Sequence, residues 1–186
     1  MKLIIHSALI LILFFSTGCN NRLIDDVYRH TLKGSDEYAA TAFIALSNLA
    51  LTQDDIKKLE HDYLNEDNLT RKYLYEYLLS KRTQEEKYTL AFIKNSRMNT
   101  PLLIKNHSQW ISIASPFYKH LSYYSKTNDE ALEIIFSLIE DSDGANLAII
   151  SLNLNEIRKM DNARFVRIAK NSGVPTSEIL MLLENE

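Results

Sequence analysis

The sequence predicts an all-α protein, and three observations support that prediction. Apolar residues recur at intervals of three and four, as in Ile56, Leu59 and Tyr63, which places them on one face of a helix. The chain of 186 residues contains four glycines and three prolines, which is few for a β-rich or loop-rich protein. Helix-capping signals recur at intervals of 12 to 18 residues. We therefore expect short helices joined by short turns.

The first helix is predicted close to residue 23, because Leu23, Ile24, Val27 and Tyr28 have helical spacing. Capping residues then predict further helix starts along the chain. These starts are Thr52, Asp67, Thr83, Thr100, Ser115, Thr127, Asp143, Asp161 and Thr176. Gly34 and Gly173 stand where helices should end, since glycine accepts the left-handed conformation at a helix end.

Three of these starts have specific signatures. Residues 83–86 (Thr-Gln-Glu-Glu) and 127–130 (Thr-Asn-Asp-Glu) read as capping boxes, in which a threonine oxygen accepts a free amide and the glutamate reaches back. Ser115-Pro116 reads as an N-cap followed by proline at the first helical position. Residues 97–101, which end in proline, are predicted to form a turn.

Short connections favour antiparallel neighbours, and stacked antiparallel pairs form an α-solenoid. The predicted helix pair is shorter than most HEAT repeats and near the tetratricopeptide length, and no repeated consensus is present, so a solenoid would be HEAT-like at most. An irregular helical bundle is the alternative arrangement. Residues 19–186 are expected to form a single helical domain.

Residues 1–18 have the three parts of an export signal. Lys2 gives a positive start, residues 3–15 form a 13-residue apolar run, and residues 16–18 are small. A membrane-spanning helix needs about 20 apolar residues, so this run is too short to span a bilayer.

Ser16-Thr17-Gly18-Cys19 resembles the lipobox of bacterial lipoproteins, although Ser16 stands where that family usually has leucine. The resemblance implies cleavage before Cys19 and attachment of acyl chains, palmitate among them, to its sulfur. Cys19 is the single cysteine, so an exported chain could form no internal disulfide, and lipidation would remove a free thiol. By resemblance to enteric sorting rules, Asn20 implies the outer membrane, with the body facing the periplasm.

Charge is unevenly distributed. The chain has a formal net charge of −3, yet residues 87–128 contain no Asp or Glu. That stretch holds six basic residues and several aromatics, a combination that favours a partner with an acidic surface. The predicted partner-binding residues are Lys94, Arg97, Lys105, Trp110, Lys119, His120, Tyr123, Tyr124 and Lys126. The alternative is that the aromatics form core and acidic helices nearby neutralise the lysines.

Anionic lipid head groups are a second possible partner for a basic surface near a membrane. Nucleic acid is not expected as a partner for an exported protein of negative net charge.

Catalytic and metal signals are weak in the sequence. HExxH, GxSxG, P-loop and dinucleotide-binding motifs are absent. The four histidines that follow Cys19, at 30, 61, 107 and 120, show no spacing of three or four for a shared metal. Residues 141–144 resemble part of a calcium loop, but the first and last ligand positions would be Ile139 and Ile150. No catalytic residue, metal or cofactor is predicted, and we do not expect an enzyme.

The sequence therefore indicates a lipid-anchored, non-catalytic protein-binding module of the bacterial envelope. One specific form is an immunity protein against an envelope-targeting toxin. Two alternatives remain: an accessory subunit of an envelope assembly or secretion machine, and an enzyme that acts on peptidoglycan or another glycan through paired carboxylates.

Overall fold

A computed structural model describes residues 23–29, 35–105, 110–140, 142, 144–175, 177 and 179. Within these ranges every regular element is a helix, which confirms the predicted all-α class. Residues 23–29 are helical, and the labelled helices follow: α2 (Asp36–Leu46), α3 (Gln53–Leu64), α4 (Leu69–Thr83), α5 (Glu86–Lys105), α6 (Trp110–Ser125), α7 (Asp129–Ser137), α8 (Gly144–Met160) and α9 (Asn162–Asn171). The predicted export signal, Cys19, Gly34 and the predicted starts at Asp143 and Thr176 lie outside the described residues.

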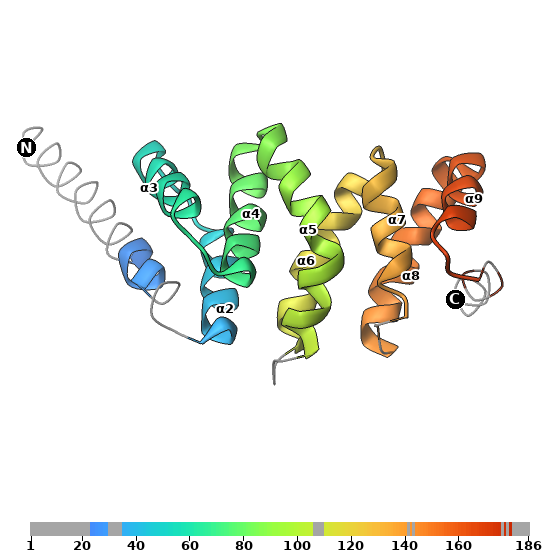
Figure 1. The fold of residues 1–186 in the computed structure, drawn as a ribbon, viewed down its shortest axis with the longest axis horizontal. Coiled ribbons are helices and arrows are strands. Elements are labelled where there is room, and N and C mark those ends of the chain that lie inside the picture. Colours follow the sequence, from blue (N-terminus) through green and yellow to red (C-terminus); the bar gives the residue numbers. More distant parts are fainter. Residues whose placement is uncertain are drawn as a thin grey trace, which may run out of the picture.

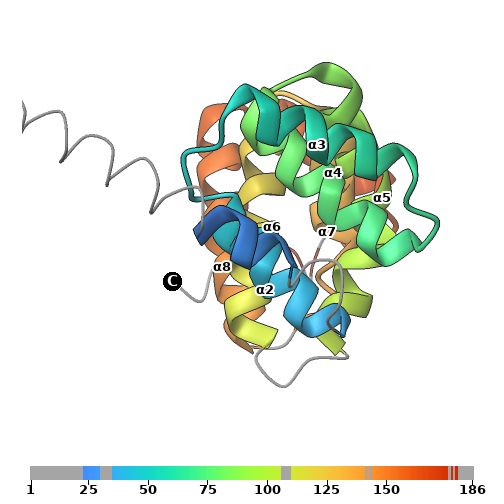
Figure 2. The ribbon, with the colours of Figure 1, turned by 90° about the vertical axis from the view of Figure 1, so that its left-hand side faces the viewer.

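The helices form a row that follows the order of the chain (Figure 1). Helices α4, α6 and α8 contact one another in succession, and so do α5, α7 and α9. This stacking of second neighbours is the order of an α-solenoid. At the N-terminal end of the row, α2 contacts α4, α5 and α6, as a helix in a bundle does. The view from that end shows α2 and α3 beside α4 (Figure 2).

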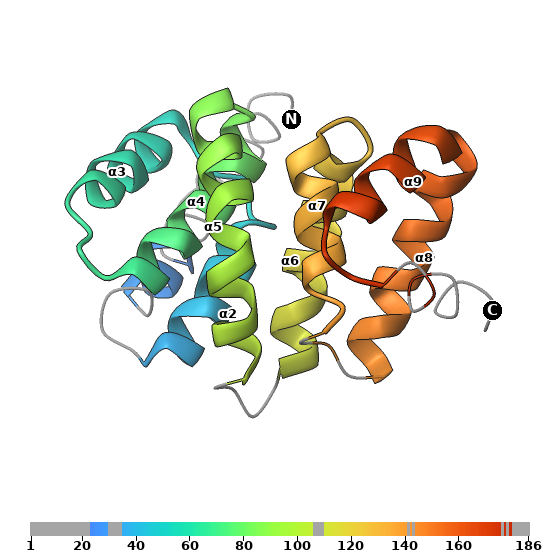
Figure 3. The same cartoon turned by 45° about the vertical axis from the view of Figure 1, so that its right-hand side comes forward.

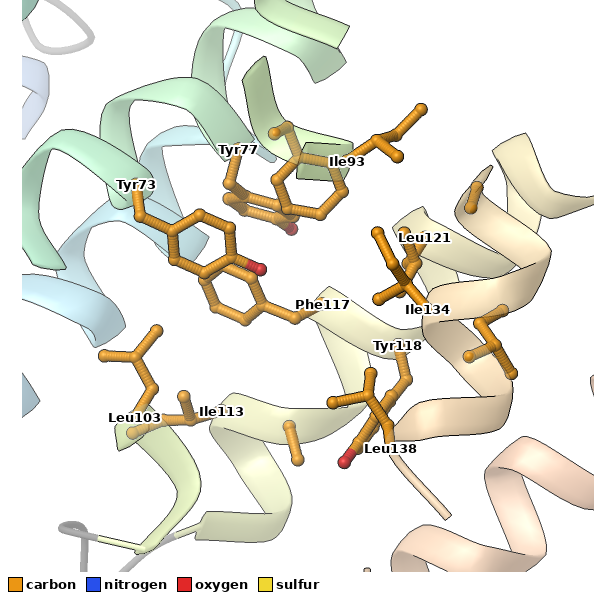
Figure 4. Close-up of a cluster of buried hydrophobic side chains, with 14 of the residues drawn as sticks. Tyr73, Tyr77, Ile93, Leu103, Ile113, Phe117, Tyr118, Leu121, Ile134 and Leu138 are labelled. Atoms are coloured by element: carbon orange, nitrogen blue, oxygen red, sulfur yellow. The ribbon is translucent and has the colours of Figure 1, made fainter. Parts of the chain in front are cut away.

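Helices α5 and α6 lie side by side at the middle of the row, between the N-terminal helices and α7–α9 (Figure 3). Their buried faces meet a continuous apolar core that includes Phe92, Ile93, Phe117 and Leu121, each at most 1% exposed. Figure 4 shows Phe117 close to the rings of Tyr73 and Tyr77, with Leu121 and Ile134 beyond. Most aromatics of residues 87–128 whose side chains are described therefore belong to the core, as the alternative interpretation expected.

Tyr73 joins three helices at the centre of this core. Its ring stacks on Phe92 of α5 at 5.4 Å and on Phe117 of α6 at 5.5 Å between centroids. Its hydroxyl lies 2.7 Å from Thr100 Oγ1 and 3.0 Å from Ser96 Oγ, both on α5. Since the Ser96 hydroxyl donates to the Phe92 carbonyl, its oxygen accepts from Tyr73, and every hydroxyl of this group is satisfied.

Glu76 is a buried carboxylate one turn further along α4. Asn95 Nδ2 of α5 donates to both of its oxygens at 2.9 Å, and the Tyr63 hydroxyl of α3 lies 3.5 Å from Oε1. Burial raises the pKa of Glu76, and the Asn95 and Tyr63 hydrogen bonds oppose that shift. The carboxylate therefore links α3, α4 and α5.

Several predicted helix boundaries are confirmed. The first helix occupies residues 23–29, with Ile24 and Tyr28 buried. Thr52 caps α3 and forms a capping box with Asp55, and Asp161 caps α9 through the Arg164 amide. Gly173 follows the end of α9 at φ 82°, the conformation that glycine accepts without strain.

Three predicted starts are shifted by one residue or replaced. Asn68 rather than Asp67 caps α4, and Asn128 rather than Thr127 caps α7, through the Ala131 amide. The box at residues 83–86 is wrong, because Thr83 is the last residue of α4 and its hydroxyl donates to the Leu79 carbonyl. Gln84 then adopts a left-handed conformation at φ 57°, and α5 begins at Glu86.

Both predicted boundaries beside a proline are wrong. Helix α5 continues through Pro101 to Lys105, so residues 97–101 are helix and Thr100 is not a start. Helix α6 begins at Trp110 and contains Pro116, so Ser115 is not an N-cap. A proline inside a helix loses one hydrogen bond and crowds the carbonyl four residues before it. Packing offsets this cost, since Thr100, Leu103 and Phe117 beside these prolines are at most 2% exposed.

Arg164 of α9 holds the junction between α6 and α7. Its Nε donates to Asp129 at 2.6 Å, and its Nη1 donates to the carbonyls of Ser125 at 2.9 Å and Lys126 at 3.2 Å. The Ser125 carbonyl is the last of α6 and the Lys126 carbonyl follows it, so neither has a partner within the helix. The hydrogen bonds from Arg164, and then those from Arg167, lower the pKa of Asp129.

We expect Arg164→Ala to lower the free energy of unfolding by about 2–3 kcal/mol, because it removes charge-assisted bonds from a side chain that is 12% exposed. Arg167→Ala is the matched control: it pairs with the same Asp129 but is 59% exposed, so we expect a loss of at most about 0.5 kcal/mol. Urea unfolding of both variants measures the difference. Equal losses would contradict the role assigned to Arg164.

Candidate functional site

The structure divides the predicted partner-binding residues between two surfaces. Lys94, Arg97 and Lys105 lie on α5, whereas Lys119, His120, Tyr123 and Tyr124 lie on α6 and Lys126 directly follows it. Trp110 is the first residue of α6, and its side chain lies outside the described part. The two helices pack through their buried faces, so their exposed residues form separate surfaces.

The α5 outer face consists of Leu90, Lys94, Arg97, Met98, Leu102 and Lys105, all exposed. Helical periodicity creates it, because the buried residues Tyr88, Phe92 and Leu103 fall on the opposite side. Apolar side chains lie among the cations: Met98 is 66% exposed and Leu90 45% exposed. Among the described residues, no ion pair joins Lys94, Arg97 or Lys105 to a carboxylate.

Two other cations of the α5–α6 region, Lys87 and Lys126, pair with carboxylates. Lys87 Nζ lies 2.9 Å from Glu85 and 3.8 Å from Glu60. The hydrogen bonds to Glu85, and then to Tyr88, raise the pKa of Lys87. Lys126 Nζ lies 2.7 Å from Glu156 of α8. The neutralisation expected as an alternative thus occurs at these two positions but not along the α5 outer face.

The second surface is a pocket of about 420 Å³, here named the α4–α6 pocket. Eight residues line it: Asn48, Tyr77, Lys81, Ser115, Pro116, Lys119, His120 and Tyr123. Asn48 follows α2, so three helices that are distant in sequence supply the walls. Three of the predicted residues, Lys119, His120 and Tyr123, are brought together here, whereas no residue of the α5 outer face takes part.

Lys81 lies at the wall of the α4–α6 pocket and was not predicted from the sequence. Its ammonium lies 3.0 Å from Ser47 Oγ and 3.2 Å from Asn48 Oδ1 at the end of α2. Burial, and then the neighbouring Arg82, lower the pKa of Lys81. Spacing alone could have placed Lys81 one turn after Tyr77, but it could not show that the end of α2 lies beside them.

His120 is mostly buried between α4 and α5, although it also borders the α4–α6 pocket. Its Nε2 lies 2.8 Å from Ser80 Oγ. The Ser80 hydroxyl donates to the Tyr77 carbonyl, so its oxygen accepts the proton of Nε2. Burial, and then the nearby Lys81, lower the pKa of His120 to about 4, which keeps the ring neutral at pH 7.

Tyr124 connects α6 to α4 and α5 rather than facing outward. Its hydroxyl donates to the Ser80 carbonyl in the last turn of α4 and accepts from Thr89 of α5, at 3.4 and 3.3 Å. Tyr123, its neighbour, is 68% exposed at the mouth of the pocket. The C-terminal half of α6 therefore has one outward side, which includes Lys119 and Tyr123, and one structural side, which includes His120 and Tyr124.

Among the described residues, no three His, Cys, Asp or Glu side chains gather as metal ligands would. In the same part of the chain, no helix has both the length and the apolar content needed to cross a membrane. Comparisons with models of protein families, with curated proteins and with solved structures find no match to this chain.

His120 should make the protein sensitive to acid. Folding lowers the pKa of His120 from 6.5 to about 4. Between these two pH values the unfolded chain therefore binds a proton at His120 that the folded protein does not bind. Stability should therefore fall by about 3 kcal/mol between pH 7 and pH 4 on account of this residue. Glu76 acts in the opposite sense, since its raised pKa favours the protonated folded state as pH falls.

Urea unfolding at several pH values measures the effect as a difference between proteins. We expect His120→Gln, which retains an N–H donor for Ser80, to lower stability at pH 7 and to flatten the decline toward pH 4. His61 is exposed, so His61→Gln is the control and should keep the wild-type slope. An unchanged slope in His120→Gln would contradict the assignment.

Proposed function

We propose that this chain is a membrane-anchored lipoprotein that acts as a non-catalytic protein-binding module in the bacterial envelope. The single observation that supports binding most strongly is the α5 outer face. There, three exposed cations lie among exposed Leu90, Met98 and Leu102, without ion-pair partners in the described part of the chain. Basic and apolar side chains mixed in this way fit an acidic surface that also offers apolar contact.

The anchor is proposed from the sequence at residues 16–19 and from the early start of the fold. Residues 23–29 are helical, and Ile24 and Tyr28 pack into the body. The Tyr28 hydroxyl donates to Asp62, and Lys58 Nζ lies 4.2 Å from the centre of the Tyr28 ring. An extended residue spans at most about 3.6 Å, so a tether of three residues from Cys19 would keep the body close to the membrane.

An immunity protein that neutralises an envelope-targeting toxin is the specific form that we favour. Such a protein acts by occupying a surface of its partner, and the α5 outer face could do so without catalytic groups. Glu76, whose raised pKa could indicate an acid catalyst, is held by Asn95 and Tyr63 and does not line the α4–α6 pocket. Its position supports a structural role.

The anchor is tested by Cys19→Ala. We expect the wild-type protein to sediment with membranes after a carbonate wash, and the variant to appear in the soluble fraction, because the acceptor of the acyl chains is gone. Ser16→Ala keeps both the cysteine and a small residue before it, so it should remain with membranes. Continued membrane attachment of Cys19→Ala would mean that another anchor exists.

The binding surface is tested by Lys94→Glu/Lys105→Glu. Reversing two cations of the α5 outer face should lower partner recovery at least about tenfold, since like charges across an interface cost several kcal/mol. The matched control is Lys159→Glu/Lys170→Glu, two exposed lysines on α8 and α9. The measurement is mild crosslinking in native envelopes, capture of the full-length tagged protein, and mass spectrometry of what is bound.

Recovery of one protein in wild-type and control samples, with loss in the reversed variant, is the expected result. A toxin as that protein would establish immunity, and a secretion or assembly component would establish the machine-subunit alternative. Equal recovery from all three samples at physiological salt would remove the α5 outer face as the interface. Recovery of anionic lipid in place of protein would contradict the protein-binding module.

A further inference from the structure

The α4–α6 pocket has a positively charged lining without a counter-charge. Two of its eight lining residues are lysines, Lys81 and Lys119, and none is acidic. In the described part of the chain neither lysine forms an ion pair. The volume, about 420 Å³, lies within the range of about 300–1,000 Å³ that is usual for small-ligand sites.

The Lys81 ammonium is held in place by the end of α2. The Ser47 hydroxyl and the Asn48 amide both donate to the Ile44 carbonyl, at 2.7 and 3.0 Å. This leaves the Ser47 and Asn48 oxygens facing Lys81, which donates to both. The negative end of the α2 dipole favours a cation here but offsets only about half a charge. The charge of Lys81 is thus positioned by neutral acceptors and is not neutralised by a carboxylate.

Helix α6 forms the facing wall. Ser115, Lys119 and Tyr123 are spaced four residues apart, so they follow one another along one side of the helix. The aromatic rings of Tyr77, His120 and Tyr123 also line the pocket. The pocket therefore combines two ammonium groups with flat apolar walls.

We propose that the α4–α6 pocket binds an organic carboxylate, with the anionic group between Lys81 and Lys119 and an attached apolar or aromatic body against the tyrosine rings. Two ammonium groups with hydroxyl donors match a single carboxylate. Phosphate sites more often use arginine forks or the free amides of a helix N-terminus, and the lining residues supply neither.

Two sources carry this chemistry: a free small carboxylate, or the carboxy-terminal residue of a protein chain. The inference goes beyond the proposed function, because the pocket shares no residue with the α5 outer face. Its test needs neither a membrane nor an identified partner, so either proposal can fail without the other.

The experiment uses the full-length protein in a neutral sugar detergent at low ionic strength, where charge interactions are least screened. Benzoate is titrated and followed by saturation-transfer NMR, with neutral benzamide as the matched probe. A second arm titrates a short peptide that ends in phenylalanine with a free carboxylate, and the same peptide with a terminal amide.

We expect saturable binding of benzoate but not of benzamide, and binding at least about tenfold weaker in Lys81→Met and in Lys119→Met. Lys119 is exposed, so Lys119→Met tests the site even if Lys81→Met disturbs the fold. Lys159→Met, outside the pocket, should bind as the wild type does. Tighter binding of the acid peptide than of benzoate identifies a chain terminus as the source, and the reverse order identifies a free small carboxylate.

Three outcomes overturn the proposal. The first is no saturable binding of benzoate or of the acid peptide. The second is equal binding of the neutral and charged probes, which would show apolar contact without anion recognition. The third is unchanged affinity in Lys119→Met, which would place any bound carboxylate elsewhere on the protein.

Discussion

The buried side chain of Tyr73 is the constraint on which the rest of the structure depends. It lies where α4, α5 and α6 meet, with its ring against both Phe92 and Phe117 and its hydroxyl held by Ser96 and Thr100. A buried tyrosine hydroxyl without hydrogen-bond partners is destabilising, so the hydroxyls of Ser96 and Thr100 favour this placement of α5 against α4. The orientation of α5 against α4 in turn decides which residues of α5 face outward. The α5 outer face exists because the opposite side of the helix is bound to Tyr73.

The same contact explains which boundaries could be predicted from the sequence and which could not. Caps such as Thr52 and Asp161 act through amides three residues away, so the local sequence contains all the information they need. Pro101 and Pro116 each destabilise a helix interior, and this cost can be read from the local sequence. What keeps α5 helical at Pro101 includes Thr100, whose partner Tyr73 is 27 residues earlier. No local pattern shows that contact, and for this reason the predicted turn at residues 97–101 was wrong.

The candidate sites show the same division. Residues 87–128 lack acidic side chains, and this alone located the basic region on what became α5 and α6. Which cations would remain unpaired depended on the neighbours that folding supplies. Lys126 meets Glu156, thirty residues later, and Lys87 meets Glu60. Lys81, outside the acid-free stretch, was missed because the Ser47 and Asn48 oxygens that hold it lie more than thirty residues before it.

The cations that pair with carboxylates lie at one end of the α5–α6 hairpin, so the two ends differ in charge. Its two helices are antiparallel, so Lys87 at the start of α5 and Lys126 near the end of α6 belong to the same end of the hairpin (Figure 1). Glu85, Glu60 and Glu156 neutralise that end. Lys94, Arg97 and Lys105 follow toward the other end without carboxylate partners among the described residues. The unpaired positive charge at this surface therefore increases along α5 from Glu86 toward Lys105. A partner with an acidic surface would be steered toward the Lys105 end, and the exposed Met98 and Leu102 beside it would provide the apolar contact that charge alone does not.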